Sequence, residues 1–113
     1  MRRWGLLVAL AASGCGSLPE EAFARRFATL DCARHWQCDR GSFDQYYFGH
    51  FDCVREKERT YEELAAFEDE YGCTYNPEAA ARAYGSLHDM TCQDWVEGGV
   101  LVGITGIWAE CGG

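Results

Sequence analysis

Two cysteines and one histidine lie at regular spacing in a short segment, where they could do chemistry. Cys32, His35 and Cys38 form the pattern Cys-x2-His-x2-Cys, and thiolate and imidazole are side chains that bind Zn²⁺. Steps of three and six residues place these side chains on different helix faces. No fourth ligand is evident, and oxidised cysteines do not bind metal. We therefore predict no metal and no cofactor, and a partly exposed His35 beside structural cysteines.

The same spacing resembles the helix of secreted phospholipases A2, Cys-x2-His-Asp-x-Cys, in which the histidine activates a water molecule beside a calcium-bound ester. The resemblance implies a small secreted hydrolase that uses His35, and this is our alternative function. However, Trp36 stands at the position of the aspartate, and no glycine-rich calcium loop precedes the segment. Calcium would therefore lack its charged ligand. Because no other catalytic motif occurs in the chain, we predict that the protein is not an enzyme.

Aromatic residues are concentrated in a second segment. Five of them fall within nine positions: Phe43, Tyr46, Tyr47, Phe48 and Phe51. We favour core packing for most of them, because a small domain fills volume around its disulfides with aromatic side chains. Tyr46 and Tyr47 are neighbours that cannot both face inward, so we predict a surface site at these two residues for an envelope protein or a glycan.

The first residues of the chain have the order of a secretory signal. Arg2 and Arg3 precede an apolar run over residues 6–12, and small residues follow. The run is far shorter than the ~20 residues of a membrane-spanning helix. The sequence therefore predicts secretion rather than a transmembrane anchor.

Ala12-Ser13-Gly14-Cys15 resembles the bacterial lipobox, in which signal peptidase II cleaves before the cysteine. The resemblance implies a signal peptide over residues 1–14. It also implies a diacylglycerol on the Cys15 thiol, an acyl chain such as palmitate on its amino group, and a tether over residues 15–19. The protein would then be a lipoprotein of the bacterial cell envelope, and Gly16 in place of aspartate favours the outer membrane. The alternative is an ordinary secreted protein in which Cys15 forms a disulfide.

The composition limits the remaining chain to one small domain over residues 20–113. The full chain has 113 residues and a net charge of −8. Loss of Arg2 and Arg3 with the signal leaves 18 acidic against 8 basic side chains, or −10. This charge argues against a nucleic-acid partner, which normally requires a basic surface.

Cysteine is the unusual residue type in this composition, with seven copies. If Cys15 carries lipid, six remain: Cys32, Cys38, Cys53, Cys73, Cys92 and Cys111. An even set in an oxidising compartment indicates three disulfides. Of the 15 possible connectivities, the order of the expected helices favours Cys38–Cys53, Cys32–Cys92 and Cys73–Cys111.

Helical periodicity and capping residues predict a mainly α, disulfide-stapled domain of about four helices. The expected helices run from Glu20 to Cys38, from a Ser42 cap to Gly49, over 51–70, and from an Asn76 cap past Leu87, with a short turn capped by Thr91. We expect an irregular, glycine-rich tail from Gly98, for which a poor helix, a short strand and a packed loop remain open.

Several segments recur, in the same order, in small cysteine-rich secreted proteins and lipoproteins of myxobacteria. They are Cys32-x5-Cys38, residues 48–54, residues 75–81 and residues 91–94. The resemblance is carried by caps, turns and cysteines, and it implies no activity. The function expected from the whole sequence is therefore a cell-envelope lipoprotein with a non-catalytic structural or interaction module.

Overall fold

The computed structural model describes residues 16–112, so the expected signal peptide and Cys15 lie outside the described residues. This part of the chain is mainly helical, as predicted. The helices are α2 (Glu20–Cys38), α3 (Arg40–Tyr46), α4 (His50–Glu70), α5 (Pro77–Asp89), α6 (Cys92–Val96) and α7 (Gly99–Ile104), and the strands are β1 (Thr74–Tyr75) and β2 (Trp108–Ala109). None of these helices is long and apolar enough to cross a membrane.

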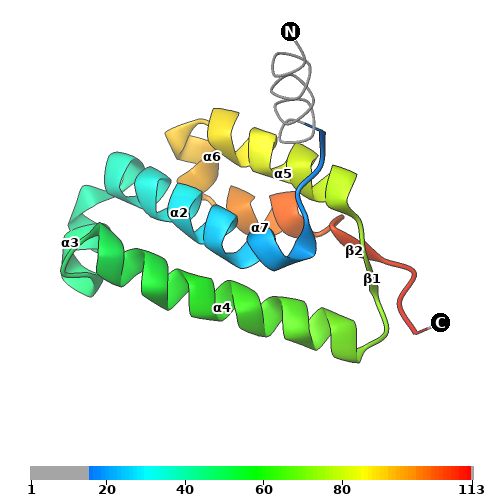
Figure 1. The fold of residues 1–113 in the computed structure, drawn as a ribbon. Helices are drawn as coiled ribbons and strands as arrows, with labels where there is room; N and C mark the ends of the chain where they lie inside the picture. The colour runs from blue at the N-terminus through cyan, green and yellow to red at the C-terminus, as the bar shows by residue number, and fades with distance from the viewer. Residues whose placement is uncertain (1–15, 113) are drawn as a thin grey trace, which may run out of the picture.

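The two longest helices, α2 and α4, form an antiparallel hairpin that α3 connects at one end (Figure 1). Helix α5 lies beside α2 and runs in the same direction, opposite to α4, and α6 and α7 follow it (Figure 1). The core between these helices is aromatic: Phe23 and Phe27 of α2 are fully buried and lie against Tyr61 of α4. Residues 16–112 contain this core and three disulfides, and so form a self-contained folding unit.

Capping residues begin the helices largely as the sequence predicts. The side chains of Asn76 and Thr91 accept hydrogen bonds from backbone N–H groups in the first turns of α5 and α6. The prediction for the start of α3 was wrong by three residues, because Asp39 rather than Ser42 caps this helix, by accepting from the Ser42 N–H. Asp39 also ends α2, so one residue makes the corner between the two helices.

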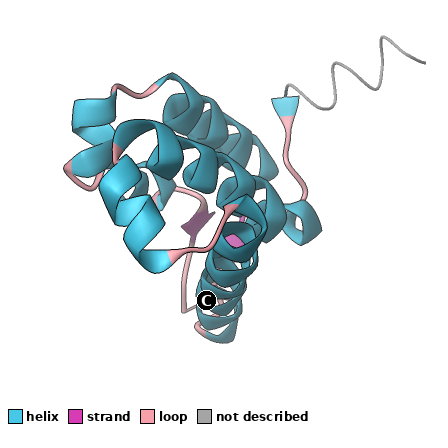
Figure 2. Ribbon diagram, turned by 90° about the vertical axis from the view of Figure 1, so that its left-hand side faces the viewer, coloured by secondary structure: helices cyan, strands magenta, loops and turns pink. Residues whose placement is uncertain are grey.

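The C-terminal tail is more regular than expected. It forms α7 and then β2, which pairs antiparallel with β1. The sequence lacks a strand signal because each strand has only two residues. After β2, the Gly112 N–H donates to the Tyr71 carbonyl, so the C-terminal segment lies beside the end of α4 (Figure 2).

Two of the three predicted disulfides were wrong. The structure pairs Cys32 with Cys53 and Cys38 with Cys92, and only the Cys73–Cys111 pairing is confirmed. The reason is helical geometry. Cys32 and Cys38 are six residues apart, which rotates them by about 120° around α2. Cys32 therefore faces the first turn of α4, whereas Cys38 faces the start of α6.

Candidate functional site

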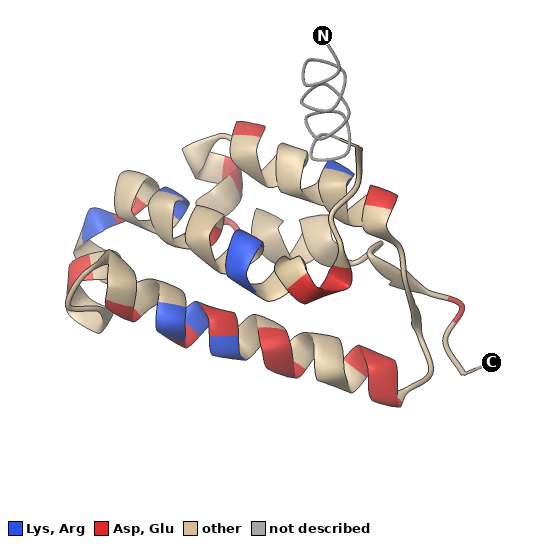
Figure 3. Cartoon of the chain, in the orientation of Figure 1, with Lys and Arg blue, Asp and Glu red and all other residues tan. Residues whose placement is uncertain are grey.

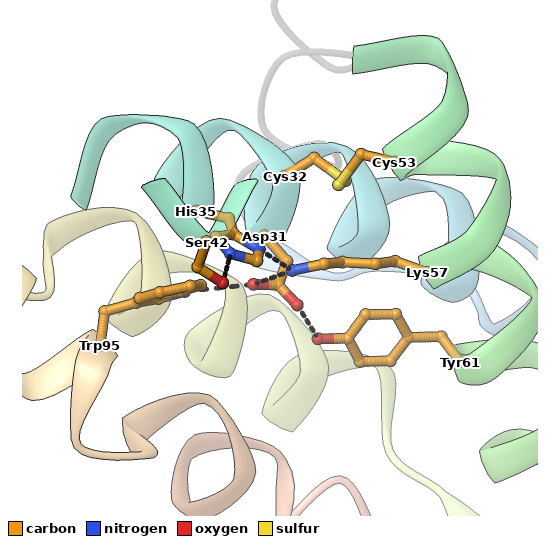
Figure 4. A network of polar contacts seen from close by, with 8 residues as sticks. All are labelled: Asp31, Cys32, His35, Ser42, Cys53, Lys57, Tyr61 and Trp95. Carbon is orange, nitrogen blue, oxygen red and sulfur yellow. Dashed lines mark hydrogen bonds and ion pairs between the residues drawn. A yellow bond between two sulfur atoms is a disulfide. The ribbon is translucent and has the colours of Figure 1, made fainter. Parts of the chain in front are cut away.

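A buried carboxylate organises a polar network between α2, α4 and α6 (Figure 4). Lys57 Nζ lies 3.2 Å from Asp31 Oδ1, and Trp95 Nε1 donates to the same oxygen at 3.1 Å. The Tyr61 hydroxyl donates to Asp31 Oδ2 at 3.0 Å. Both carboxylate oxygens are therefore engaged, as a buried charge requires.

Our sequence predictions missed this network, although a signal for it exists. Asp31 stands four residues after Phe27, on the apolar stripe of α2, and Lys57 stands between Val54 and Tyr61 on the stripe of α4. A charged residue at a core position needs a partner of opposite charge. The Asp31–Lys57 pair could therefore have been predicted, because two adjacent helices each carry one charged residue at a core position and the two charges are opposite.

His35 extends the network in a direction that does not suit a general base. Its Nδ1 lies 3.1 Å from Lys57 Nζ, and its Nε2 lies 2.9 Å from Ser42 Oγ. A protonated lysine has only donors, so we assign Nδ1 as the acceptor and place the imidazole proton on Nε2. A base that activates a serine needs the opposite arrangement, with a free nitrogen facing the hydroxyl.

Burial and charge shift the ionisation of this network. His35 is 8% exposed, so the prediction of a partly exposed imidazole was wrong. Burial lowers the pKa of His35, and the Lys57 ammonium lowers it further. Burial also lowers the pKa of Lys57, against the opposing effect of Asp31. The pKa of Tyr61 is raised by burial and by the Asp31 charge. The lowered pKa of His35 therefore favours a neutral imidazole beside the Lys57–Asp31 pair.

Exposed aromatic residues gather where α2, α3 and α4 meet, and we call this set the aromatic corner. Its members are Trp36, Tyr46, Phe48, His50 and Phe51. Phe48 is fully exposed, and Phe51 is 82% exposed. The Trp36 and His50 rings lie 5.8 Å apart. Core packing, the interpretation we favoured for most of this segment, is therefore wrong for Phe48 and Phe51, whereas the predicted exposure of Tyr46 is confirmed.

Arginines stack on this surface. The Arg40 guanidinium lies 4.1 Å from the centre of the Trp36 ring, and Arg55 lies 5.9 Å from that of Phe51. Such cation–π contacts hold aromatic rings in place at a surface. The aromatic corner therefore presents partly ordered rings to solvent.

The two tyrosines of the predicted surface site have different positions. Tyr46 is 67% exposed and belongs to the aromatic corner. Tyr47 is half-buried, with its ring 5.7 Å from His35 and 5.4 Å from Phe43. The structure therefore separates the two neighbours, one facing solvent and one facing the network.

One group of possible metal ligands occurs within residues 16–112. It combines Glu68 with Cys73 and Cys111, but the two sulfurs are bonded to each other. Oxidised sulfur is no zinc ligand, so this group cannot hold zinc while the disulfide is intact.

The charged groups are unevenly distributed: basic residues lie in the first half of α4 and acids alone in its second half, whereas α7 carries no charge (Figure 3).

The comparisons with known proteins add no relative. No protein-family model matches the chain, and no curated protein or solved structure is significantly similar to it.

Proposed function

We propose that this chain is a cell-envelope lipoprotein whose domain is a non-catalytic interaction module, and that the aromatic corner binds a protein partner. The observation that carries the proposal is the exposure of Phe48 and Phe51 at one corner of the fold, because these two are the most exposed large apolar side chains of the described residues. Exposed apolar patches rimmed by polar residues mark interaction sites, and Arg40 and Arg55 flank the rings of the aromatic corner.

The composition of the aromatic corner favours a protein over a glycan. Tryptophan, tyrosine and arginine dominate the binding energy of protein interfaces, and Trp36, Tyr46, Arg40 and Arg55 occur together here. The Cys32–Cys53 disulfide ties α2 to α4, and these two helices carry Trp36 and Arg55. The Cys38–Cys92 disulfide fixes the end of α2 against α6. A surface held rigid before binding loses less entropy when it binds.

The pairing of the other six cysteines supports a lipid anchor at Cys15. The six cysteines of residues 16–112 pair with one another in three disulfides. No intramolecular thiol is then left for Cys15, which agrees with lipid attachment and disfavours a disulfide at this residue. The proposed location is the outer membrane, with the lipid as membrane contact.

The anchor is tested by metabolic labelling with an alkyne fatty acid. The wild-type protein should carry the label and sediment with membranes, and Cys15→Ser should lose both properties. A Cys15→Ser protein that is still processed and anchored would contradict this part of the proposal.

The binding surface is tested by site-specific photo-crosslinking in intact cells. A benzoylphenylalanine at position 48 should give a discrete cross-linked protein of defined mass. The same group at position 71 is the control, because Tyr71 is an exposed aromatic residue at the opposite end of α4. Cross-links to glycan, to lipid alone, or equally from both positions would overturn the assignment of a protein partner.

A hydrolase that uses His35 is the alternative function, and it would require His35 to act as a base across its 2.9 Å contact with Ser42, against the proton position assigned above. A fluorophosphonate probe distinguishes the two, since it labels serines that a base activates. We expect Ser42 to stay unlabelled, because the imidazole proton faces its hydroxyl. Labelling of Ser42 that His35→Gln abolishes would favour the hydrolase.

A further inference from the structure

A cavity of about 500 Å³ opens beside the polar network, apart from the aromatic corner. Its walls are aliphatic, with Leu64 of α4 facing Val100, Leu101 and Ile104 of α7. This volume is within the range of small-molecule sites, which are mostly apolar with a few convergent polar groups.

The polar end of this cavity offers a donor. Lys57 lines the cavity with a side chain that is 15% exposed, and its ammonium group has three N–H donors. Asp31 and His35 accept two of them, and the third has no acceptor among residues 16–112. The Tyr47 and Trp95 rings lie within 5.9 Å and 5.5 Å of Nζ and also line the cavity.

Charge at this end selects against ionised ligands. Lys57 and Asp31 already neutralise each other, so an anion would approach the Asp31 carboxylate and a cation would approach the Lys57 ammonium. Neither an anion nor a cation would therefore meet a net charge of opposite sign, and both would lose hydration on entering a cavity with aliphatic walls. A neutral acceptor, by contrast, satisfies the free N–H without adding a charge.

We propose that this cavity binds an uncharged, mainly apolar small molecule that carries a carbonyl-type acceptor. Lys57 Nζ donates to the carbonyl oxygen, Tyr47 and Trp95 flank it, and the aliphatic side chains of α4 and α7 enclose the apolar body. The site is independent of the aromatic corner and of the lipid anchor, so it stands whether or not those proposals hold.

The test compares ligands that differ in one group. Butyrophenone and butylbenzene have the same carbon skeleton, but butyrophenone has a carbonyl where butylbenzene has a methylene. The third ligand, 4-phenylbutyrate, has a charged carboxylate in place of the terminal methyl group of butylbenzene. We would titrate each into the disulfide-bonded domain from residue 16 onward and follow the Trp95 indole N–H by NMR. Butyrophenone should bind at least tenfold more tightly than butylbenzene, as one hydrogen bond from a charged donor implies, and more tightly than 4-phenylbutyrate.

Variants then assign the site. Lys57→Met should remove the advantage of the ketone while the hydrocarbon still binds. Because this change leaves Asp31 without its counter-ion, a second variant avoids the network: Thr60→Trp, at an exposed residue of the cavity lining, should block both ligands. Glu63→Trp is the matched control, since Glu63 is exposed and outside the lining. Equal binding of ketone and hydrocarbon, no saturable binding, or full binding to Thr60→Trp would overturn the proposal.

Discussion

Two groups of aromatic side chains, similar in composition, lie in opposite environments in this protein. Phe23, Phe27, Tyr61 and Trp108 are at most 7% exposed, and their rings meet around Phe23 at 4.7 to 5.6 Å. The rings of the aromatic corner instead face solvent, although they lie only a few residues from buried Phe43 and Cys53. Residue type alone therefore does not decide burial here.

The difference comes from the backbone that carries each group. Phe23 and Phe27 are four residues apart on α2, so both face α4. Phe51 is two residues before Cys53, a rotation of about 200°, and Cys53 takes the inward position because its sulfur is bonded to Cys32. The disulfide thus directs Phe51 to the surface.

The largest expected effect tests the buried group. Phe23→Ala should lower the free energy of unfolding by about 4 kcal/mol, because it removes a fully buried ring from contact with four others. Urea denaturation of the oxidised domain measures this value. A loss below about 1 kcal/mol would show that the core does not depend on Phe23.

Removal of the disulfide should affect both groups of aromatic residues. Cys32→Ala with Cys53→Ala should cost about 3 kcal/mol, as expected for opening a cross-link between residues 21 apart. Hydrogen exchange should also rise in α3 and the first turn of α4. If the stability falls but exchange at the aromatic corner is unchanged, the disulfide does not hold that surface in place.

The network between the two groups gives the next effect. Asp31→Asn should cost about 3 kcal/mol, because it leaves the Lys57 charge nearly buried without its counter-ion. Thermal unfolding of Asp31→Asn and of Asp31→Asn with Lys57→Met measures it. The double variant should be more stable than the single one, and the reverse order would contradict the assignment of an ion pair.

Acid should weaken the same network through His35. Its pKa in the folded state is below the ordinary 6.5, so the unfolded chain binds more protons and stability is lost as the pH falls below about 6.5. Glu20 acts in the opposite direction, since burial and the nearby Asp69 raise its pKa. Glu20→Gln with and without His35→Gln should therefore be compared between pH 7 and pH 5. Between pH 7 and pH 5, only the variant that retains His35 should lose free energy of unfolding. If the free energy of unfolding changes equally with pH in both variants, the buried imidazole is not neutral.

The smallest effect belongs to the exposed group. Phe48→Ala should change the free energy of unfolding by less than about 0.5 kcal/mol, because the side chain makes no buried contact. Urea denaturation beside Phe23→Ala gives the direct contrast. A cost above 1 kcal/mol would mean that Phe48 packs in the folded protein.

Local signals in the sequence predicted local structure well. Asn76 and Thr91 begin helices because a cap depends only on the next three residues. The disulfide partners depend instead on the direction in which each cysteine faces across α2, α4 and α6, and that direction follows from packing. The glycine-rich tail has weak preferences of its own, so contacts with β1 and α5 decide its conformation.

The candidate sites divide in the same way. The aromatic segment was visible in the sequence, but the exposure of Phe48 and Phe51 depends on the turn between α3 and α4. The network of Asp31, Lys57 and Trp95 joins residues up to 64 positions apart, and no local pattern brings Trp95 into it.

Binding by the aromatic corner is the central claim, and one measurement tests it most directly. The immobilised domain is incubated with solubilised envelope fractions, and each retained protein is quantified by mass spectrometry. Three versions are compared: wild type, Phe48→Ala with Phe51→Ala, and Phe67→Ala with Tyr71→Ala, which removes exposed aromatics at the other end of α4. We predict a protein that the wild type and the Phe67/Tyr71 variant retain equally and that the Phe48/Phe51 variant loses. Equal recovery by all three would contradict the account.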